Sequence, residues 1–323
     1  MRIVVLDGSA ANPGDIDWNE LSSLGELTVY DVTPQELLLE RAADAEVAIT
    51  NKTVFDRDSI EKLPDLKYIG VLATGFNVID IEAATEKGIV VTNVPEYSTY
   101  ATMQHTIALL LELTNKVAVH SSAVRAGDWV RCPQFCFWNE PLTELWNKTA
   151  VVVGYGRIGR RVAATLSSLG MNVTIVPHHL PSEPAPAGSH ESLYRFTTLE
   201  EALPTADVVT LHCPLTAETK GIINSRTLAS MKKGSLLVNA ARGPLVVEQD
   251  IRDALESGQL AGYAADVVCC EPMAADNPLL DAPNCVITPH TAWAPRETRA
   301  RLIKAAADNL RAYMAGQPIN RVN

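Results

Sequence analysis

Three side chains with complementary chemistry come directly after short apolar runs in the second half of the chain: Arg242, Glu271 and His290. Such runs are typical of buried parallel strands, and parallel sheets place their ligands at the carboxyl ends of strands. A histidine can donate a proton as a general acid, and a hydrogen-bonded glutamate fixes its tautomer and favours the charged ring. The planar guanidinium of an arginine can form two hydrogen bonds to a carboxylate. We therefore expect the three residues to form one catalytic site for a small anionic substrate.

A glycine-rich loop provides the second chemical signal. Residues 154–159 read Gly-Tyr-Gly-Arg-Ile-Gly, after an apolar run and before an amphipathic helix predicted over 158–169. In this context the pattern is a dinucleotide fingerprint: Gly154 makes the turn, Gly156 admits the pyrophosphate, and Gly159 lets helix and sheet pack closely. A nicotinamide cofactor would supply a hydride. Together with the proton donor and the cation, the loop predicts reduction of a 2-keto acid.

The choice between NAD and NADP depends on the end of the next predicted strand. Pro177 stands where dinucleotide-binding folds usually carry an acid for the ribose 2′-hydroxyl. No arginine follows Pro177 to pair with a 2′-phosphate. The next two residues are His178 and His179. A partly protonated His178 could bind that phosphate, and solvated loop histidines are the alternative. We expect NAD as the cofactor and leave NADP open.

Apolar runs and amphipathic stretches alternate along the chain, which predicts an α/β fold with parallel sheets. Helices are predicted over 100–117 and over 296–315, the second between Pro295 and Gly316, and an exposed loop over the proline-rich residues 177–189. The predicted strands are 3–6, 27–30, 47–50, 68–72, 89–93, 150–153, 173–176, 208–212, 236–240, 263–267 and 285–288.

Aromatic residues gather in and directly after the irregular segment 128–145: Trp129, Phe135, Phe137, Trp138 and Trp146. Aromatic side chains concentrate both in cores and in the centres of subunit interfaces. Local core and subunit contact are therefore both open interpretations.

Composition limits the classes of function. At roughly 150 residues per domain, 323 residues suggest two domains. The net charge of −11 argues against nucleic acid and anionic membranes as partners, and the longest apolar stretch, 107–113, is too short to span a bilayer. Six cysteines without metal-binding spacing predict no metal site and a reduced, cytoplasmic protein. We expect Cys269 and Cys270 to pack in the core.

The ordered set of motifs resembles the D-isomer-specific 2-hydroxyacid dehydrogenases over essentially the whole chain. The motifs are the glycine loop, Leu-His-Cys-Pro-Leu-Thr at 211–216, Asn-Ala-Ala-Arg-Gly-Pro-Leu-Val at 239–246, Asp266, Glu-Pro at 271–272 and Pro-His at 289–290. Residues 51–53, 135–138 and 292–294 are most similar to the glycerate dehydrogenase and hydroxypyruvate reductase branch.

The resemblance implies a Rossmann-like cofactor domain inserted into a flavodoxin-like substrate domain, both doubly wound. It places the substrate domain at 1–99, the dinucleotide-binding domain at 100–290, and a helix returning to the substrate domain at 291–323. It also implies a homodimer and conversion of hydroxypyruvate or glyoxylate to D-glycerate or glycolate.

Site residues follow from the same resemblance, with Arg242, Glu271 and His290 as the catalytic set. Implied cofactor contacts, besides Gly154, Gly156, Gly159 and His178, are Thr74, Arg157, Ile158, Cys213, Pro214, Ala240, Arg242 and Asp266, the last facing the carboxamide. Implied substrate contacts are Ala73, Thr74 and Gly75, from a loop that binds the carboxylate, and Arg242. Lys52 follows a strand and could attract the anion, with a solvated lysine as the alternative.

Two other functions are open. One is phosphoglycerate dehydrogenase, although no extra basic cluster offers itself for a phosphate. The other is a dinucleotide-sensing binding protein on the same fold, like the family's corepressors. Turnover of NADH with any 2-keto acid distinguishes an enzyme from a sensor.

Overall fold

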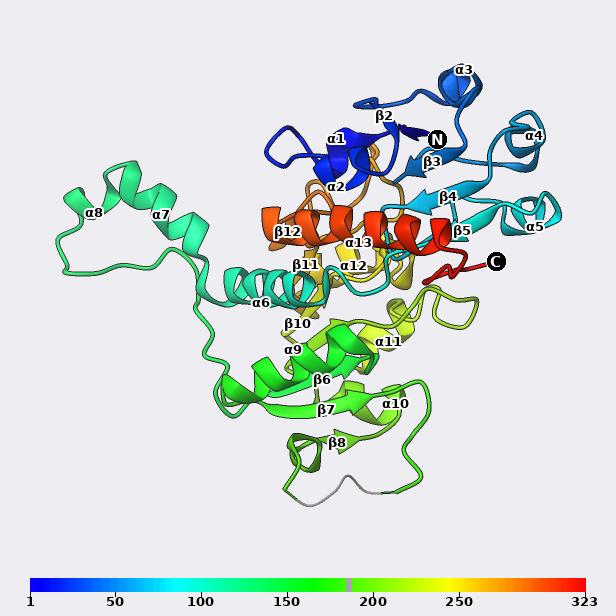
Figure 1. The fold of residues 1–323 in the computed structure, drawn as a ribbon. Helices are drawn as coiled ribbons and strands as arrows, with labels where there is room; N and C mark the ends of the chain where they lie inside the picture. Colours follow the sequence, from blue (N-terminus) through cyan, green and yellow to red (C-terminus); the bar gives the residue numbers. More distant parts are fainter. Residues whose placement is uncertain (184–187) are drawn as a thin grey trace. The chain divides into compact units, whose positions relative to one another are not determined.

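The computed structural model describes residues 1–183 and 188–323 (Figure 1). The chain divides into two compact units, one made of Met1–Ser98 and Trp293–Asn323, the other of Thr99–Ala292. The second unit is therefore inserted in sequence between two parts of the first. Among the described residues, no helix has the length and apolar character needed to cross a membrane.

The first unit is built on a five-stranded sheet in the order β2-β1-β3-β4-β5, and every pairing is parallel. Its strands are β1 (Arg2–Val5), β2 (Glu26–Val29), β3 (Val47–Thr50), β4 (Tyr68–Val71) and β5 (Val90–Thr92). Its helices are α1 (Gly8–Ala11), α2 (Asn19–Ser22), η1 (Gln35–Leu37), α3 (Leu38–Ala42), α4 (Arg57–Glu61), α5 (Ile81–Glu86) and α13 (Arg296–Met314). This strand order is that of flavodoxin-like folds.

Helices cover both faces of this sheet, which explains why its strands are continuous apolar runs. The closing helix α13 packs on one face through Leu302 and Leu310. Helices α3 and α5 pack on the other face through Leu38 and Ala84. Gly316, with φ of 74°, directly follows the C-cap residue of α13, as its position in the sequence predicted.

The second unit is built on a seven-stranded parallel sheet in the order β12-β11-β10-β9-β6-β7-β8. Its strands are β6 (Thr149–Val153), β7 (Asn172–Val176), β8 (Arg195–Phe196), β9 (Val208–Leu211), β10 (Ser235–Asn239), β11 (Leu260–Ala265) and β12 (Cys285–Ile287). The strand order reverses direction at β6, between β7 and β9. Such a switch point is where doubly wound sheets bind ligands.

Helices also cover both faces of the second sheet. On one face lie α6 (Thr99–Asn115) and α9 (Arg157–Ser168), and on the other α10 (Leu199–Ala202), α11 (Ser225–Ser230) and α12 (Glu248–Glu256). Short 3-10 turns are η2 (His190–Leu193), η3 (Leu203–Thr205) and η4 (Gly243–Leu245). The predicted fold class, with two doubly wound parallel sheets, is confirmed.

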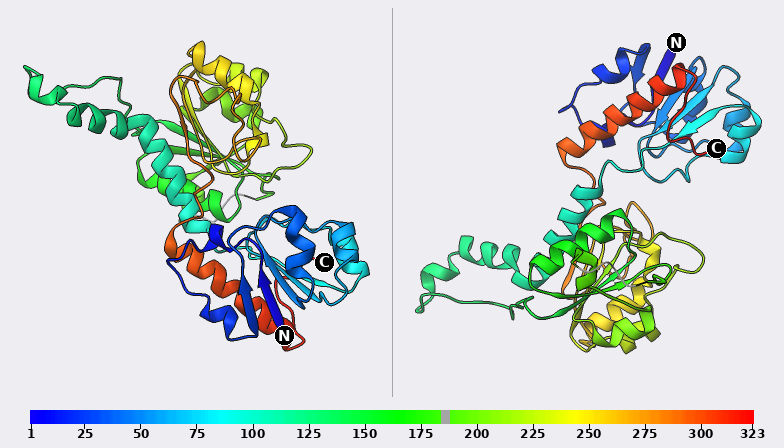
Figure 2. Two further views of the ribbon diagram at one scale, coloured as in Figure 1. Left: turned by 90° about the horizontal axis from the view of Figure 1, so that it is seen from above. Right: turned by 60° about the horizontal axis from the view of Figure 1, so that its bottom comes forward.

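A projecting arm follows α6. Lys116 adopts a left-handed conformation with φ of 51°, so the helix predicted over 100–117 breaks there, and α7 (Val117–Arg125) and α8 (Asp128–Arg131) follow. Figures 1 and 2 show this arm extending away from the sheet of its own unit. Phe135 is 89% exposed and Trp138 66% exposed. The local-core interpretation of these aromatic residues is therefore wrong.

The proline-rich loop predicted over 177–189 is described in part. Residues 177–183 contain no helix or strand and are largely exposed, as predicted. The portion at 184–187 lies outside the described residues.

Candidate active site

The glycine loop joins β6 to α9 at the switch point of the second sheet. Gly154 has φ of 96°, and a side chain on it would lie 2.5 Å from the backbone nitrogen of Cys213. A side chain on Gly159 would overlap the carbonyl of Gly154. At Gly156, by contrast, no other group lies within 4 Å of the Cβ position. The loop thus packs tightly at its two ends and leaves open space at the glycine where a pyrophosphate would approach.

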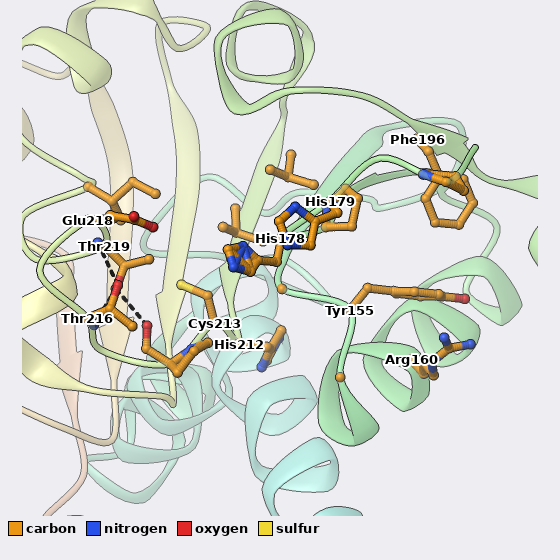
Figure 3. A pocket seen from close by; sticks show the side chains of 18 of the residues that line it. Tyr155, Arg160, His178, His179, Phe196, His212, Cys213, Thr216, Glu218 and Thr219 are labelled. Atoms are coloured by element: carbon orange, nitrogen blue, oxygen red, sulfur yellow. Dashed lines mark hydrogen bonds between the residues drawn. The ribbon is translucent and has the colours of Figure 1, made fainter.

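A pocket of about 910 Å³ opens beside this loop. Its lining includes Gly154 and Gly156, together with Pro177, His178 and His179 from the end of β7. The two imidazole rings stack with centroids 4.0 Å apart. Figure 3 shows them side by side, with Cys213 on one side and Tyr155 and Phe196 on the other. The volume and mixed lining fit a substantial part of a dinucleotide.

An aromatic and charged cluster forms one wall of the pocket. The rings of Tyr155 and Phe196 meet edge to face, and the Arg160 guanidinium lies 4.4 Å from the centre of the Tyr155 ring. Arg160 also forms an ion pair with Glu191. Burial raises the pKa of Tyr155 to about 12, so this side chain is a neutral phenol at physiological pH.

His212 follows β9 behind the glycine loop. Its Cβ lies 3.6 Å from the Cβ position of Gly159, and its Nε2 is buried with no hydrogen-bond partner among the described residues. Burial lowers the pKa of His212 to about 3. The ring is therefore neutral, and it supports the loop by packing.

Glu271 and His290 are brought together as predicted. Oε2 of Glu271 lies 2.6 Å from Nδ1 of His290, and both side chains are 34% exposed. Oε1 of Glu271 accepts the backbone N–H of Val268 at 3.2 Å. The carboxylate thus fixes the imidazole through Nδ1 and leaves Nε2 as the nitrogen that can face a substrate.

Arg242 is held on the neighbouring loop by a buried asparagine. Asn239 accepts the N–H of Ala241 at 3.1 Å and donates to the carbonyl of Arg242 at 2.9 Å. The exposed guanidinium donates to the carbonyl of Ala241 at 2.7 Å. A side chain on Gly243 would overlap the backbone of Val268. This glycine therefore lets the Arg242 loop rest on the loop that carries Glu271, a contact that the sequence analysis missed.

The loop before Glu271 has a further anchor in Glu248 of α12. Its Oε1 accepts the N–H of Cys269 at 2.7 Å, and its Oε2 accepts from the side chain of Asn277 at 2.9 Å. Both Cys269 and Cys270 are exposed free thiols, so the prediction that they pack in the core is wrong. The reason is that the loop leaves the sheet after Val268, and only the residues before it stay inside.

Asp266 is buried, with 1% of its surface exposed. Its carboxylate accepts hydrogen bonds from Thr288 Oγ1 at 2.7 Å and from the N–H groups of Thr291 and Ala292 at 2.8 Å each. Burial alone would raise the pKa of Asp266, but these bonds and one from His105 outweigh it and lower the pKa. The carboxylate is thus ionised and bound within the protein.

Two of the other predicted cofactor contacts in the second unit, Cys213 and Pro214, line the pocket. Burial raises the pKa of the Cys213 thiol. Arg157 is exposed at the first turn of α9, whereas the Ile158 side chain packs against the core, so only its backbone can face a ligand. Ala240 is buried just after β10.

The predicted substrate contacts of the first unit lie on two neighbouring loops. Lys52 follows β3 and is exposed, and its backbone N–H is held by Asp7. Residues 73–75 follow β4, where Asn93 donates to the carbonyl of Thr74 at 2.7 Å. Asn51, next to Lys52, donates to the carbonyl of Leu72 at 2.6 Å and so joins the two loops.

Comparisons with known proteins agree with this geometry. The family described as D-isomer specific 2-hydroxyacid dehydrogenase, NAD binding domain, matches residues 107–292. The hydroxypyruvate reductase of Blautia hydrogenotrophica is 47% identical over all of both chains. The glycerate dehydrogenase of Methylorubrum extorquens is 38% identical over 90% of this chain and 89% of its own. The solved structure of TT0316 protein from Thermus thermophilus superposes with a TM-score of 0.84 at 35% identity, over all of both chains.

The two parallel sheets and the glycine loop at a switch point define a dinucleotide-binding oxidoreductase. More closely, the chain belongs to the D-isomer specific 2-hydroxyacid dehydrogenase family. It is an NAD(P)-dependent enzyme of that family, and the resemblance inferred from the motifs is confirmed.

Proposed function

We propose that this enzyme reduces hydroxypyruvate to D-glycerate and glyoxylate to glycolate, with Arg242, Glu271 and His290 as its catalytic residues. The observation that carries the proposal is the bond of 2.6 Å between Glu271 Oε2 and His290 Nδ1. It fixes an imidazole that can donate a proton from Nε2, beside a loop that carries an arginine. The names of the relatives, a hydroxypyruvate reductase and a glycerate dehydrogenase, support the substrate class.

His290 supplies the proton in this reaction. The carbonyl oxygen at C2 becomes a hydroxyl by taking the proton from Nε2, and Glu271 stabilises the imidazolium before that transfer. Arg242 pairs with the substrate carboxylate and polarises the carbonyl, because its guanidinium is always charged and fork-shaped. In the reverse direction His290 accepts the proton from the hydroxyl.

The second unit fits a nicotinamide dinucleotide, since the loop leaves open space at Gly156 and a pocket of about 910 Å³ adjoins it. When bound, such a cofactor would supply the hydride for the reduction. Gly154, Gly156, Gly159 and the first turn of α9 would hold its pyrophosphate. Other proposed contacts are Thr74, Arg157, Ile158, His178, Cys213, Pro214, Ala240, Arg242 and Asp266.

In the first unit, the backbone N–H groups of Ala73, Thr74 and Gly75 bind the substrate carboxylate, and Lys52 attracts it. We also propose a homodimer, supported by the exposed aromatic arm, because exposed apolar patches of this kind mark protein interfaces. A cytoplasmic location is supported by the six free cysteines.

The test is an assay with hydroxypyruvate, glyoxylate and pyruvate, each with NADH and with NADPH. We expect reduction of hydroxypyruvate and glyoxylate to exceed that of pyruvate. The variant His290→Ala should lose about 10²–10⁴-fold in turnover while binding NADH normally. Binding of NADH without turnover of any keto acid would instead indicate a dinucleotide sensor, and near-normal turnover of the variant would rule out His290 as the acid.

A further inference from the structure

Helix α6 contributes a histidine to the segment that carries His290. Nε2 of His105 lies 2.8 Å from Oγ1 of Thr288 and 3.3 Å from Oδ1 of Asp266. His105 is partly exposed, whereas the Asp266 carboxylate is buried. The proposed reaction gives this histidine no role.

The chemistry of the three groups fixes the direction of their hydrogen bonds. The Asp266 carboxylate can only accept, so the hydroxyl of Thr288, 2.7 Å away, donates its proton to it. The alternative acceptor, the carbonyl of Ala265, is 3.5 Å from the same hydroxyl. Because that proton is used, the hydroxyl oxygen accepts from His105. The ring therefore carries its proton on Nε2.

This relay fixes the backbone on both sides of His290. The N–H of His290 donates to the carbonyl of Thr288 at 2.9 Å, and His290 itself has φ of 55°, a left-handed conformation that residues with side chains rarely adopt. The next two N–H groups, of Thr291 and Ala292, both donate to Asp266. An unusual conformation persists only where neighbouring contacts determine it. Here the side chain before His290 in the relay, Thr288, and the two N–H groups after it all bond the Asp266 carboxylate.

We propose that His105 is a positioning residue for His290, acting through the hydroxyl of Thr288 and the carboxylate of Asp266. Removing the ring leaves the Thr288 hydroxyl without its donor and loosens the segment 288–292. The imidazole of His290 then loses its fixed position relative to the substrate, while the dinucleotide pocket beside β7 is unaffected. This inference rests on the proposed acid role of His290.

The first test measures turnover. We expect His105→Leu and Thr288→Val each to lower kcat about tenfold with little change in the affinity for NADH. The double variant should be no slower than the slower single variant, because both changes break the same relay. His105→Gln should recover much of kcat, since its amide can donate in place of Nε2–H. The relay would be overturned if the losses of kcat in the two single variants multiplied in the double variant. It would also be overturned if His105→Gln recovered no kcat.

The second test does not depend on turnover. Hydrogen exchange of the N–H groups of Thr291 and Ala292, measured without cofactor, should speed up in His105→Leu. The matched control is Thr106→Val on the same helix, which removes a buried bond of 2.8 Å to the carbonyl of Thr102 and should leave this exchange and kcat unchanged. Unchanged exchange in His105→Leu overturns the inference, whatever reaction the enzyme catalyses. Faster exchange with unchanged kcat, in an enzyme that needs His290, overturns it as well.

Discussion

The carboxylate of Glu271 bridges two parts of the second unit, with Oε2 2.6 Å from Nδ1 of His290 and Oε1 3.2 Å from the backbone nitrogen of Val268. Glu271 is therefore fixed by the end of β11, and it fixes in turn a histidine that follows β12. Because neighbouring parallel strands end at the same edge of a sheet, this pairing follows directly from the strand order.

Glu271→Gln should slow the reduction, and the deficit should grow as pH rises. The amide keeps a hydrogen-bonding group at Nδ1 but removes the negative charge that stabilises the imidazolium. We expect a loss of about tenfold near pH 6 and more near pH 8, measured as kcat/KM for hydroxypyruvate. Asp276→Asn, which removes an exposed charge from the same loop, is the control. Identical pH profiles for Glu271→Gln and the parent would contradict the pairing.

Gly243→Ala should raise the KM for the keto acid without weakening NADH binding. The added Cβ overlaps the backbone of Val268, so the loop that carries Arg242 must move away from the loop that carries Glu271. We expect an increase in KM of at least about tenfold and a loss of about 1–3 kcal/mol in stability, the usual cost of overpacking.

Gly258→Ala is the control for that experiment. Gly258 has φ of 70° and open space around it, so alanine there costs about 1 kcal/mol of stability without touching the site. If both variants lose stability alike and neither changes KM, the contact at Gly243 supports the fold alone.

The parts of the site that depend on strand ends could be predicted from the sequence. The parts that depend on contacts between residues distant in sequence could not. Glu271 and His290 could be placed because each follows a recognisable strand. The role of Gly243 could not, since it depends on a backbone contact with Val268 that no local pattern marks. His105 lies on the helix predicted over 100–117, and its partner Thr288 is far away in sequence, so no local pattern marks their contact.

The sequence patterns also gave a wrong prediction of which apolar side chains are exposed. Cys269 and Cys270 continue the apolar run of β11 in the sequence, but the chain turns out of the sheet before them. Phe135 and Trp138 are large and apolar, yet they lie exposed on an arm. In both cases the hydrophobic character of a residue was clear, and only the path of the backbone determined where it lies.

His212 should make stability depend on pH. Its pKa falls from 6.5 to about 3 on burial, so below pH 6.5 the unfolded chain binds a proton that the folded protein does not. The stabilisation is complete above pH 6.5 and is lost as pH falls toward 3. Between pH 7 and pH 5 the loss from this group is about 2 kcal/mol.

The measurement is urea unfolding at both pH values. His212→Leu should lose about 2 kcal/mol less than the parent over this interval, although it can be less stable at pH 7. His179→Leu, at an exposed histidine, should follow the parent. Parallel pH dependence of His212→Leu and the parent would show that the ring is not buried in its neutral form.

The last prediction concerns the cofactor. Pro177 lines the pocket where an acid would accept the ribose 2′-hydroxyl and repel a 2′-phosphate, and the stacked pair His178 and His179 follows it. The nearby carboxylates in the lining are Glu183, Glu191 and Glu218, and Glu191 is paired with Arg160. NADH therefore lacks its usual acceptor at Pro177, and NADPH lacks an arginine there.

We expect modest discrimination, with NADH preferred over NADPH by no more than about tenfold in kcat/KM, or about 1.4 kcal/mol. His178 is the side chain next to Pro177 that could contact a 2′-phosphate. His178→Leu should therefore reduce the use of NADPH more than that of NADH, measured as kcat/KM for each cofactor.

Pro177→Asp should make the enzyme strongly selective for NADH, because one carboxylate restores both the acceptor for the 2′-hydroxyl and the repulsion of a 2′-phosphate. Pro177→Asn is the matched control: it offers a hydrogen-bonding group without charge and should improve NADH use without rejecting NADPH. Steady-state kinetics of each variant with NADH and with NADPH measure the two selectivities. A parent enzyme that already prefers NADH by more than about a hundredfold would contradict the prediction. Such selectivity requires an acceptor for the ribose 2′-hydroxyl other than the residue at position 177.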